Sequence, residues 1–124
     1  MTRALARLAL ASATLAMSAC APPGGPQQLA VATTRAVYAD DLDGTIAHFD
    51  PALRNQVTSG AVGQLSTTLR ALGAMQGFTP VGSTPAQGRY DYRVAFDKGQ
   101  MLVQLRLDGD RQIAAYRITP LAAQ

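Results

Sequence analysis

The chain of 124 residues contains one cysteine, one histidine and no tryptophan, and all of its acidic residues are aspartate. The single cysteine, Cys20, excludes a disulfide within the chain. The single histidine, His48, has no second histidine or carboxylate at ligand spacing, which argues against a metal site and against a Ser-His-Asp triad. Gly-x-Ser-x-Gly and phosphate-binding glycine loops are also missing. We therefore expect no metal and no cofactor, and a length of 124 residues fits one folded domain.

The sequence also lacks an apolar run long enough to cross a bilayer comfortably. Leu8–Met17 is short and follows two arginines, which is typical of a secretory signal. The next residues, Met-Ser-Ala-Cys, resemble the bacterial lipobox, in which the cysteine is lipid-modified. Residues 1–19 are thus predicted to be a lipoprotein signal peptide and Cys20 the lipidated N-terminus. The alternative is an ordinary signal peptide that ends near Ala19 or Ala21.

Lipid on Cys20 would explain the odd cysteine, and two or three acyl chains would anchor the protein stably at about 0.8 kcal/mol per buried methylene. Ala21 follows, whereas Asp at this place commonly retains a lipoprotein in the inner membrane. The resemblance therefore implies the outer membrane, facing the periplasm. Residues 20–28 are predicted to be the lipidated cysteine and a flexible tether, residues 29–120 a single domain and residues 121–124 a tail.

The formal charge of +3 gives little information about partners. Removal of Arg3 and Arg7 with the signal peptide leaves nine basic against eight acidic side chains, a charge of +1. A nucleic-acid partner requires a clustered basic face with interleaved aromatic residues. We expect no nucleic-acid partner.

Apolar spacing predicts helices in the first part of the domain. One helix is predicted from Leu29 to about Asp40, and Thr45–Phe49 as one or two helical turns. Asp50-Pro51 is typical of an N-cap followed by the first helical position, which predicts a helix to about Val57.

The clearest helical pattern comes next, with Ser59 as its expected cap and Gly73 near its end. Its apolar residues recur at spacings of three and four: Val62, Leu65, Leu69 and Leu72. Gly77–Gly82 is predicted to be a strand at the edge of a sheet, because Pro80 cannot donate to the ladder. Ser83–Gly88 is predicted to be a loop.

Arg89–Asp108 predicts a β-hairpin that turns at Lys98-Gly99, with glycine supplying a positive φ. In this register four apolar pairs lie opposite each other across the two strands on one face: Phe96 and Met101, Val94 and Val103, Tyr92 and Leu105, Tyr90 and Leu107. Two charged pairs lie opposite each other on the other face: Asp91 and Arg106, and Arg89 and Asp108.

Gln112–Thr119 is predicted to be the last strand, in one of two registers. A four-residue loop places Ala114, Tyr116 and Ile118 on the apolar face beside Leu105, Val103 and Met101, whereas a three-residue loop places Ile113, Ala115 and Arg117 there. The first is favoured because it keeps an unpaired arginine out of the core. The expected class is α+β, with N-terminal helices packed on a four-stranded antiparallel curved sheet.

Four stretches of the sequence carry a family resemblance: Phe49–Arg54, Leu72–Phe78, Val94–Gly99 and Ile113–Pro120. Through them the sequence resembles the cystatin-like superfold typified by nuclear transport factor two. More narrowly, it resembles an uncharacterised bacterial lipoprotein domain family whose members also precede some secreted α/β-hydrolases. The resemblance implies helices across a curved sheet and a cell-envelope setting, and it brings no catalytic residues.

Three tyrosines of the apolar sheet face are the candidate ligand-binding residues: Tyr90, Tyr92 and Tyr116. Some members of the superfold isomerise steroids with an aspartate base beside tyrosine in an apolar pocket. The corresponding candidates here are Asp40, Asp41 and Asp50. The competing interpretation is that the tyrosines belong to the core and that Asp50 is a helix cap.

The opposite sheet face is weighted toward arginine, and its candidate partner-binding residues are Arg89, Arg93, Arg106 and Arg117. A solvated face with ion pairs is one interpretation. A homodimer or envelope-protein contact is the other. The sequence thus favours a lipid-anchored, non-catalytic binding or accessory module, with a small-molecule enzyme that uses a Tyr/Asp pocket as the alternative.

Overall fold

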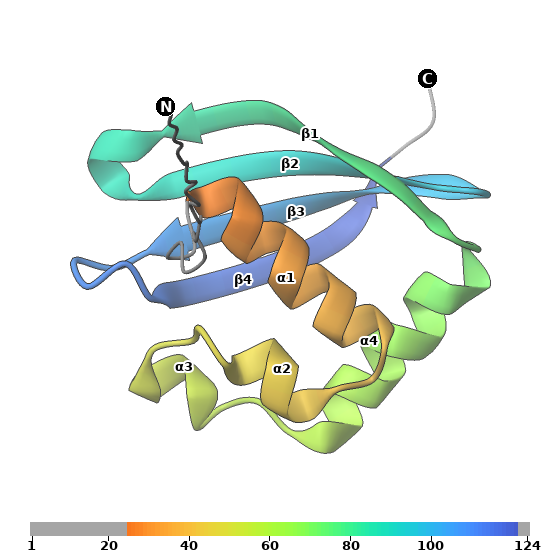
Figure 1. The fold of residues 1–124 in the computed structure, drawn as a ribbon, viewed down its shortest axis with the longest axis horizontal. Coiled ribbons are helices and arrows are strands. Elements are labelled where there is room, and N and C mark those ends of the chain that lie inside the picture. The colour runs from red at the N-terminus through yellow and green to blue at the C-terminus, as the bar shows by residue number, and fades with distance from the viewer. Residues whose placement is uncertain (1–24, 122–124) are drawn as a thin grey trace, which may run out of the picture.

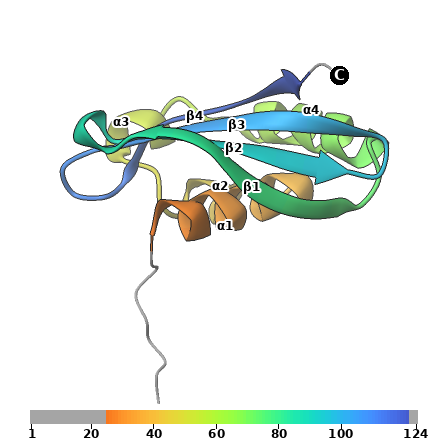
Figure 2. The same ribbon diagram turned by 90° about the horizontal axis from the view of Figure 1, so that it is seen from above.

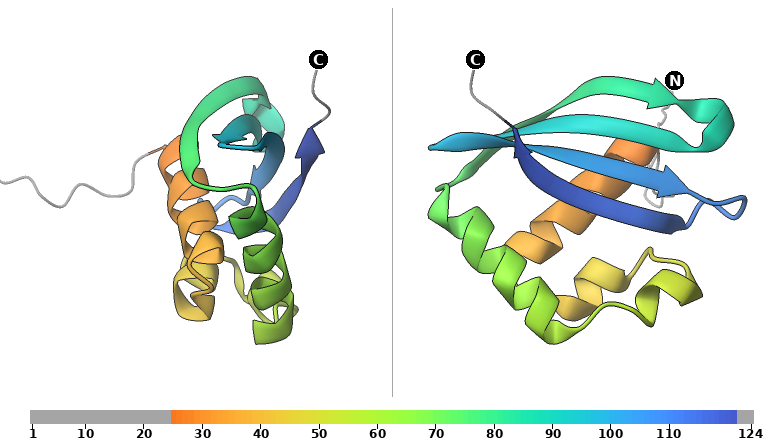
Figure 3. Two further views of the ribbon diagram at one scale, coloured as in Figure 1. Left: turned by 90° about the vertical axis from the view of Figure 1, so that its right-hand side faces the viewer. Right: turned by 180° about the vertical axis from the view of Figure 1, so that it is seen from behind.

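The computed structural model describes residues 25–121, which form two layers (Figure 1). Four antiparallel strands form one sheet in the order β1-β2-β3-β4. The helices cover one face of this sheet, with α1 running across it and the sheet curling over the helices (Figures 2 and 3). The predicted α+β class is confirmed. The predicted signal peptide and Cys20 lie outside the described residues.

Helix α1 spans Pro26–Tyr38 and buries one side of its surface against the sheet. It begins three residues before the expected Leu29, so Pro26–Gln28 belong to the helix and not to the tether. Proline loses no hydrogen bond at the first helical position, which explains this start. The helix ends before Asp40, whose φ of 58° reverses the chain. Its buried residues are Leu29, Ala30, Thr33, Thr34 and Val37.

Two short helices follow, and each begins at an aspartate cap. Asp41 accepts a hydrogen bond from the Gly44 N–H at the start of α2, Leu42–Ile46. Asp50 accepts one from the Leu53 N–H at 2.8 Å at the start of α3, Pro51–Arg54, which confirms the predicted cap. The expected extension to Val57 is wrong, because the backbone must become extended at Thr58 to cap the next helix.

Helix α4 spans Ser59–Ala71 and buries Val62, Ser66 and Leu69. Its cap is Thr58, whose hydroxyl accepts the Ala61 N–H, and not the expected Ser59. Gly73 lies just beyond the end of the helix, where it was predicted, and has a φ of 91°.

Strand β1 spans Met75–Thr84 at the edge of the sheet, two residues longer at each end than predicted. Its pairing with β2 shifts register near Gln76 and near Val81, on either side of Pro80. A short 3-10 helix, η1, Pro85–Gln87, then leads to Gly88, where the chain takes a φ of 72°.

Strands β2, Arg89–Phe96, and β3, Gly99–Leu107, form the predicted hairpin. The register is wrong by two residues, because Phe96 lies opposite Gly99 and not opposite Met101. The turn is therefore Asp97-Lys98, and Gly99 does not have a positive φ. The loop between α4 and β1 fixes this turn. The Lys98 N–H donates to the Leu72 carbonyl at 2.8 Å, and the Asp97 N–H donates to the Ala74 carbonyl at 3.1 Å.

The shift of two residues leaves each side chain on its predicted face and changes only its partner. Tyr92 now lies opposite Val103, Val94 opposite Met101 and Tyr90 opposite Leu105. On the outer face Arg89 lies opposite Arg106, and Asp91 lies opposite Gln104. Neither expected charged pair forms.

Strand β4 spans Ile113–Leu121. Tyr116 and Ile118 lie on the apolar face and Arg117 lies outside, as the four-residue loop predicts. The predicted register is wrong by two residues, because Tyr116 lies opposite Leu105 and Ile118 opposite Val103, and not opposite Val103 and Met101. A register shift between Arg106 and Leu107 brings Ile113 into the core in place of Ala114.

Ile113 also fixes β4 to the helical layer. Its N–H donates to the His48 carbonyl at 2.7 Å, and its carbonyl accepts the Asp50 N–H at 2.9 Å. His48 thus takes part in the fold through its backbone.

Candidate functional site

The first candidate site lies between the N-terminal turn of α1 and one end of the sheet. It is a pocket of about 400 Å³. Three elements supply its lining: Gly25, Pro26, Gln27 and Gln28 from the start of α1, Pro80, Gly82 and Ser83 from β1, and Tyr90 and Tyr92 from β2. We call it the tyrosine pocket. The structure thus brings two of the three predicted tyrosines together.

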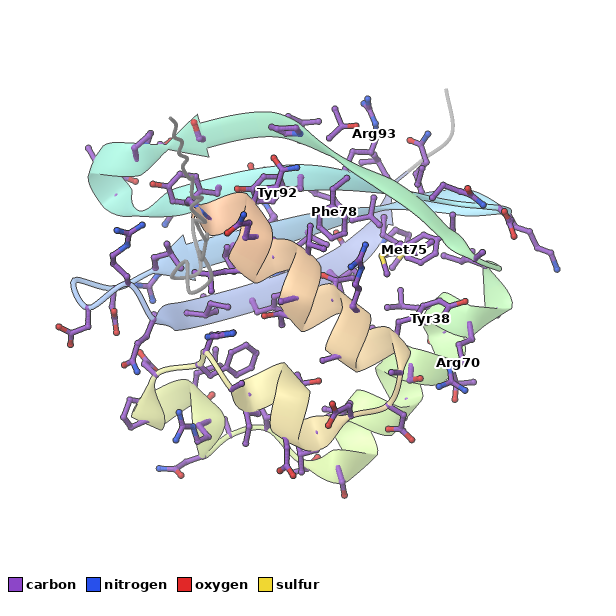
Figure 4. The ribbon with its side chains drawn as sticks, viewed as in Figure 1. Tyr38, Arg70, Met75, Phe78, Tyr92 and Arg93 are labelled. Carbon is purple, nitrogen blue, oxygen red and sulfur yellow. The ribbon has the colours of Figure 1, made fainter. Side chains whose placement is uncertain are left out.

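Tyr92 is the central residue of the tyrosine pocket. Its side chain is only 4% exposed and packs against Phe78, with ring centroids 6.2 Å apart (Figure 4). Within residues 25–121 its hydroxyl has no hydrogen-bond partner, and the ring lines the pocket. Burial raises the pKa of Tyr92, and the nearby Tyr90 and Asp91 raise it further. The phenol is therefore neutral at ordinary pH and can donate one hydrogen bond to a molecule in the pocket.

Tyr116, the third predicted tyrosine, lies elsewhere. Its hydroxyl and the Thr34 Oγ1 share a hydrogen bond of 2.6 Å, and its ring packs against Phe49 with centroids 6.2 Å apart. Burial strongly raises the pKa of Tyr116, although its bond to Thr34 partly opposes this. The ring borders a smaller, apolar depression of about 200 Å³ beneath α2, α3 and α4. Because its hydroxyl is already paired, Tyr116 acts as part of the core.

The predicted acidic residues do not join the tyrosine pocket. Asp41 and Asp50 cap α2 and α3, and Asp40 occupies the exposed turn after α1. The residues that line the pocket include no carboxylate and no histidine. Within residues 25–121 no group of three or more metal-ligating side chains is assembled. The geometry therefore offers binding groups and no acid–base pair.

A second candidate site lies on the outer face of the sheet. Three of the four predicted arginines, Arg89, Arg106 and Arg117, border a hollow of about 410 Å³. Its other lining residues are Ser83, Thr84, Asp91, Gln104, Leu105 and Ala115. We call it the arginine hollow. Arg93, the fourth, is not part of the lining and points away from the helices (Figure 4).

Sequence reasoning missed the α1 wall of the tyrosine pocket, because Pro26–Gln28 were assigned to the tether. Gly25 followed by Pro26 was the available signal, since proline is common at the first helical position.

It also missed the hydrogen bonds around Tyr38, which lies at the far end of α1. The Tyr38 hydroxyl donates to the Gly73 carbonyl at 2.8 Å, and the Tyr38 carbonyl accepts from the Ser66 hydroxyl and the Arg70 guanidinium. Arg70 also lies 5.9 Å from the centre of the Tyr38 ring (Figure 4). These contacts join α1 to α4 and have a structural role.

Comparisons with protein-family models, with curated proteins and with solved structures found no match. None of the helices within residues 25–121 has the length and apolar character needed to span a bilayer.

Proposed function

We propose that this protein is a lipid-anchored, non-catalytic binding module of the bacterial cell envelope, of the cystatin-like superfold. Its ligand would be a small, mostly apolar molecule that enters the tyrosine pocket. The lipobox-like sequence at Cys20 supports the anchor and an outer-membrane location facing the periplasm. The helices lying across a curved antiparallel sheet support the superfold assignment.

The unpaired hydroxyl of Tyr92 is the observation that carries the proposal. The Tyr92 ring is buried, since the residue is 4% exposed, and it borders an open pocket. Its hydroxyl has no partner within the described residues and is accessible from the pocket, because the Thr33 Oγ1 is the one fully buried side-chain oxygen left unpaired there. A ligand with one acceptor atom and an apolar body would complete this arrangement.

The wall composition defines the ligand further. Two prolines and two tyrosines form rigid, largely apolar walls, and such surfaces lose little side-chain entropy when a ligand binds. The pocket also falls within the size range of small-molecule sites. A flat aromatic or alicyclic molecule fits these walls best.

An uncharged fluorescent probe, N-phenyl-1-naphthylamine, tests the pocket. We expect saturable fluorescence enhancement with the full chain. Ser83→Phe should abolish it, because Ser83 lines the pocket from the exposed edge strand. Thr79→Phe is the matched control, since Thr79 is exposed on the same strand and lies opposite Arg93 on the outer face. Equal probe binding by both variants would contradict the proposal.

The anchor has its own test. Cys20→Ser should release the protein from the membrane fraction or leave it uncleaved, because the lipid is attached through the cysteine sulfur. Cell fractionation and mass spectrometry of the mature N-terminus would show either result. A Cys20→Ser protein that stays in the membrane at the mature size would exclude the lipid anchor.

A further inference from the structure

The arginine hollow has an unusual arrangement of charge. Arg89 of β2 lies directly opposite Arg106 of β3, and Arg117 of β4 lies opposite Gln104, one step along the same face. Like charges directly opposite each other on neighbouring strands are destabilising. The sheet therefore places cations together where an alternation of charge would be more stable.

Few carboxylates are available to neutralise these arginines. Asp108, the expected partner of Arg89, accepts the N–H groups of Asp110 and Gln112 in the turn before β4. Asp91 is the single carboxylate among the lining residues. Within residues 25–121 no ion pair or hydrogen bond engages the three guanidinium groups. Three arginines and one aspartate leave the hollow with a formal charge of +2.

We propose that the arginine hollow binds a small ligand with two oxyanion groups, either phosphates or carboxylates. Guanidinium groups donate paired hydrogen bonds that match the geometry of both anions. A charge of −2 would balance the hollow and relieve the repulsion between Arg89 and Arg106. Gln104 and the hydroxyl of Thr84 supply further donors in the same lining.

A second copy of the chain fits this face poorly. In a two-fold dimer the same patch meets itself, so two arginine hollows would bring together six guanidinium groups and two carboxylates. A small dianion avoids this repulsion. The hollow and the tyrosine pocket share Ser83 of the edge strand in their linings, but the arginines lie on the opposite face of the sheet from Tyr90 and Tyr92.

Isothermal titration of the full chain with pyrophosphate and, separately, with succinate tests the proposal. An ionic strength of about 0.15 M keeps the Debye length near 8 Å, so that charges outside the hollow are largely screened. We expect one-site binding of at least one probe, and the preferred probe identifies phosphate or carboxylate as the ligand group. Arg106→Gln and Arg117→Gln should each weaken binding about tenfold. Asp91→Asn should tighten it several-fold, because it removes the one negative charge of the lining.

Arg93→Gln is the matched control, since it removes the same charge from the same sheet face outside the hollow. It should leave affinity within about twofold. Arg106→Gln should unfold no more easily than the parent protein, because it removes a like-charge contact, so its loss of affinity would reflect the site. Absence of saturable binding of both probes, or equal weakening by Arg93→Gln and Arg106→Gln, would overturn the proposal. A dimer that Arg117→Gln dissociates would also overturn it.

Discussion

Two neighbouring threonines of α1 should respond in opposite directions to the same substitution. Thr33 and Thr34 are both fully buried. Thr34 shares its hydroxyl with Tyr116 at 2.6 Å, whereas the Thr33 Oγ1 has no hydrogen-bond partner within the described residues. Replacement by valine exchanges the hydroxyl for a methyl group of similar size at either position.

The magnitudes follow from these environments. Thr33→Val removes an unsatisfied buried hydroxyl and should raise the free energy of unfolding by about 1 kcal/mol. Thr34→Val leaves the buried Tyr116 hydroxyl unpaired and should lower it by about 2 kcal/mol. Helix propensity does not interfere, because threonine and valine have nearly the same value.

Urea unfolding followed by circular dichroism measures both changes. For a domain of this size, 1 kcal/mol corresponds to a shift of about 4–8 °C in Tm, so thermal unfolding provides a second reading. The double variant Thr34→Val/Tyr116→Phe should recover much of the loss, since both partners are then apolar. Destabilisation by Thr33→Val equal to that by Thr34→Val would refute the reasoning.

The remaining predictions concern alkaline pH and two glycines. Burial raises the pKa of Tyr116 above that of the unfolded chain, and it raises the pKa of Tyr92 in the same direction. The stability that Tyr116 contributes is complete below about pH 10 and is lost as pH rises further, by up to about 1.4 kcal/mol per pH unit. The loss from Tyr92 is smaller, because its hydroxyl is accessible from the pocket. Urea unfolding from about pH 8 to pH 11 should show a shallower loss for Tyr116→Phe; an unchanged slope would contradict this. Gly73→Ala should destabilise by about 2 kcal/mol, because φ is 91° and the new Cβ would lie 2.7 Å from the Asp97 Cβ. Gly60→Ala in α4, whose new Cβ would meet nothing closer than 3.9 Å, should be neutral or stabilising by up to about 1 kcal/mol in the same assay.

The sequence pattern predicted the sheet faces better than the strand partners. Alternation places Tyr92 and Val94 inward in any register that differs by an even number of residues. The actual register depends on hydrogen bonds from the Asp97-Lys98 turn to Leu72 and Ala74, which precede β1. A pattern confined to the two strands contains no information about these contacts.

For the candidate sites too, the sequence predicted the sheet face of a residue but not its partners. Tyr90 and Tyr92 were predicted because they alternate on one strand, whereas the role of Tyr116 depends on Thr34 of a helix far away in the sequence. The arginine hollow was predicted as a face, but its unpaired charge follows from the register, which places Arg89 opposite Arg106. The α1 wall of the tyrosine pocket could not be predicted from apolar spacing, because Pro26–Gln28 contribute no apolar stripe.

Fluorine NMR of the chain labelled with 3-fluorotyrosine tests the proposed ligand site most directly. The chain has four tyrosines; Tyr90 and Tyr92 line the tyrosine pocket, and Tyr38 and Tyr116 do not. Single Tyr→Phe variants would assign the four signals. Addition of N-phenyl-1-naphthylamine should shift the signals of Tyr90 and Tyr92 and leave that of Tyr38 unchanged. Unmoved Tyr90 and Tyr92 signals, or a shift confined to Tyr116, would contradict a ligand site at the tyrosine end of the sheet.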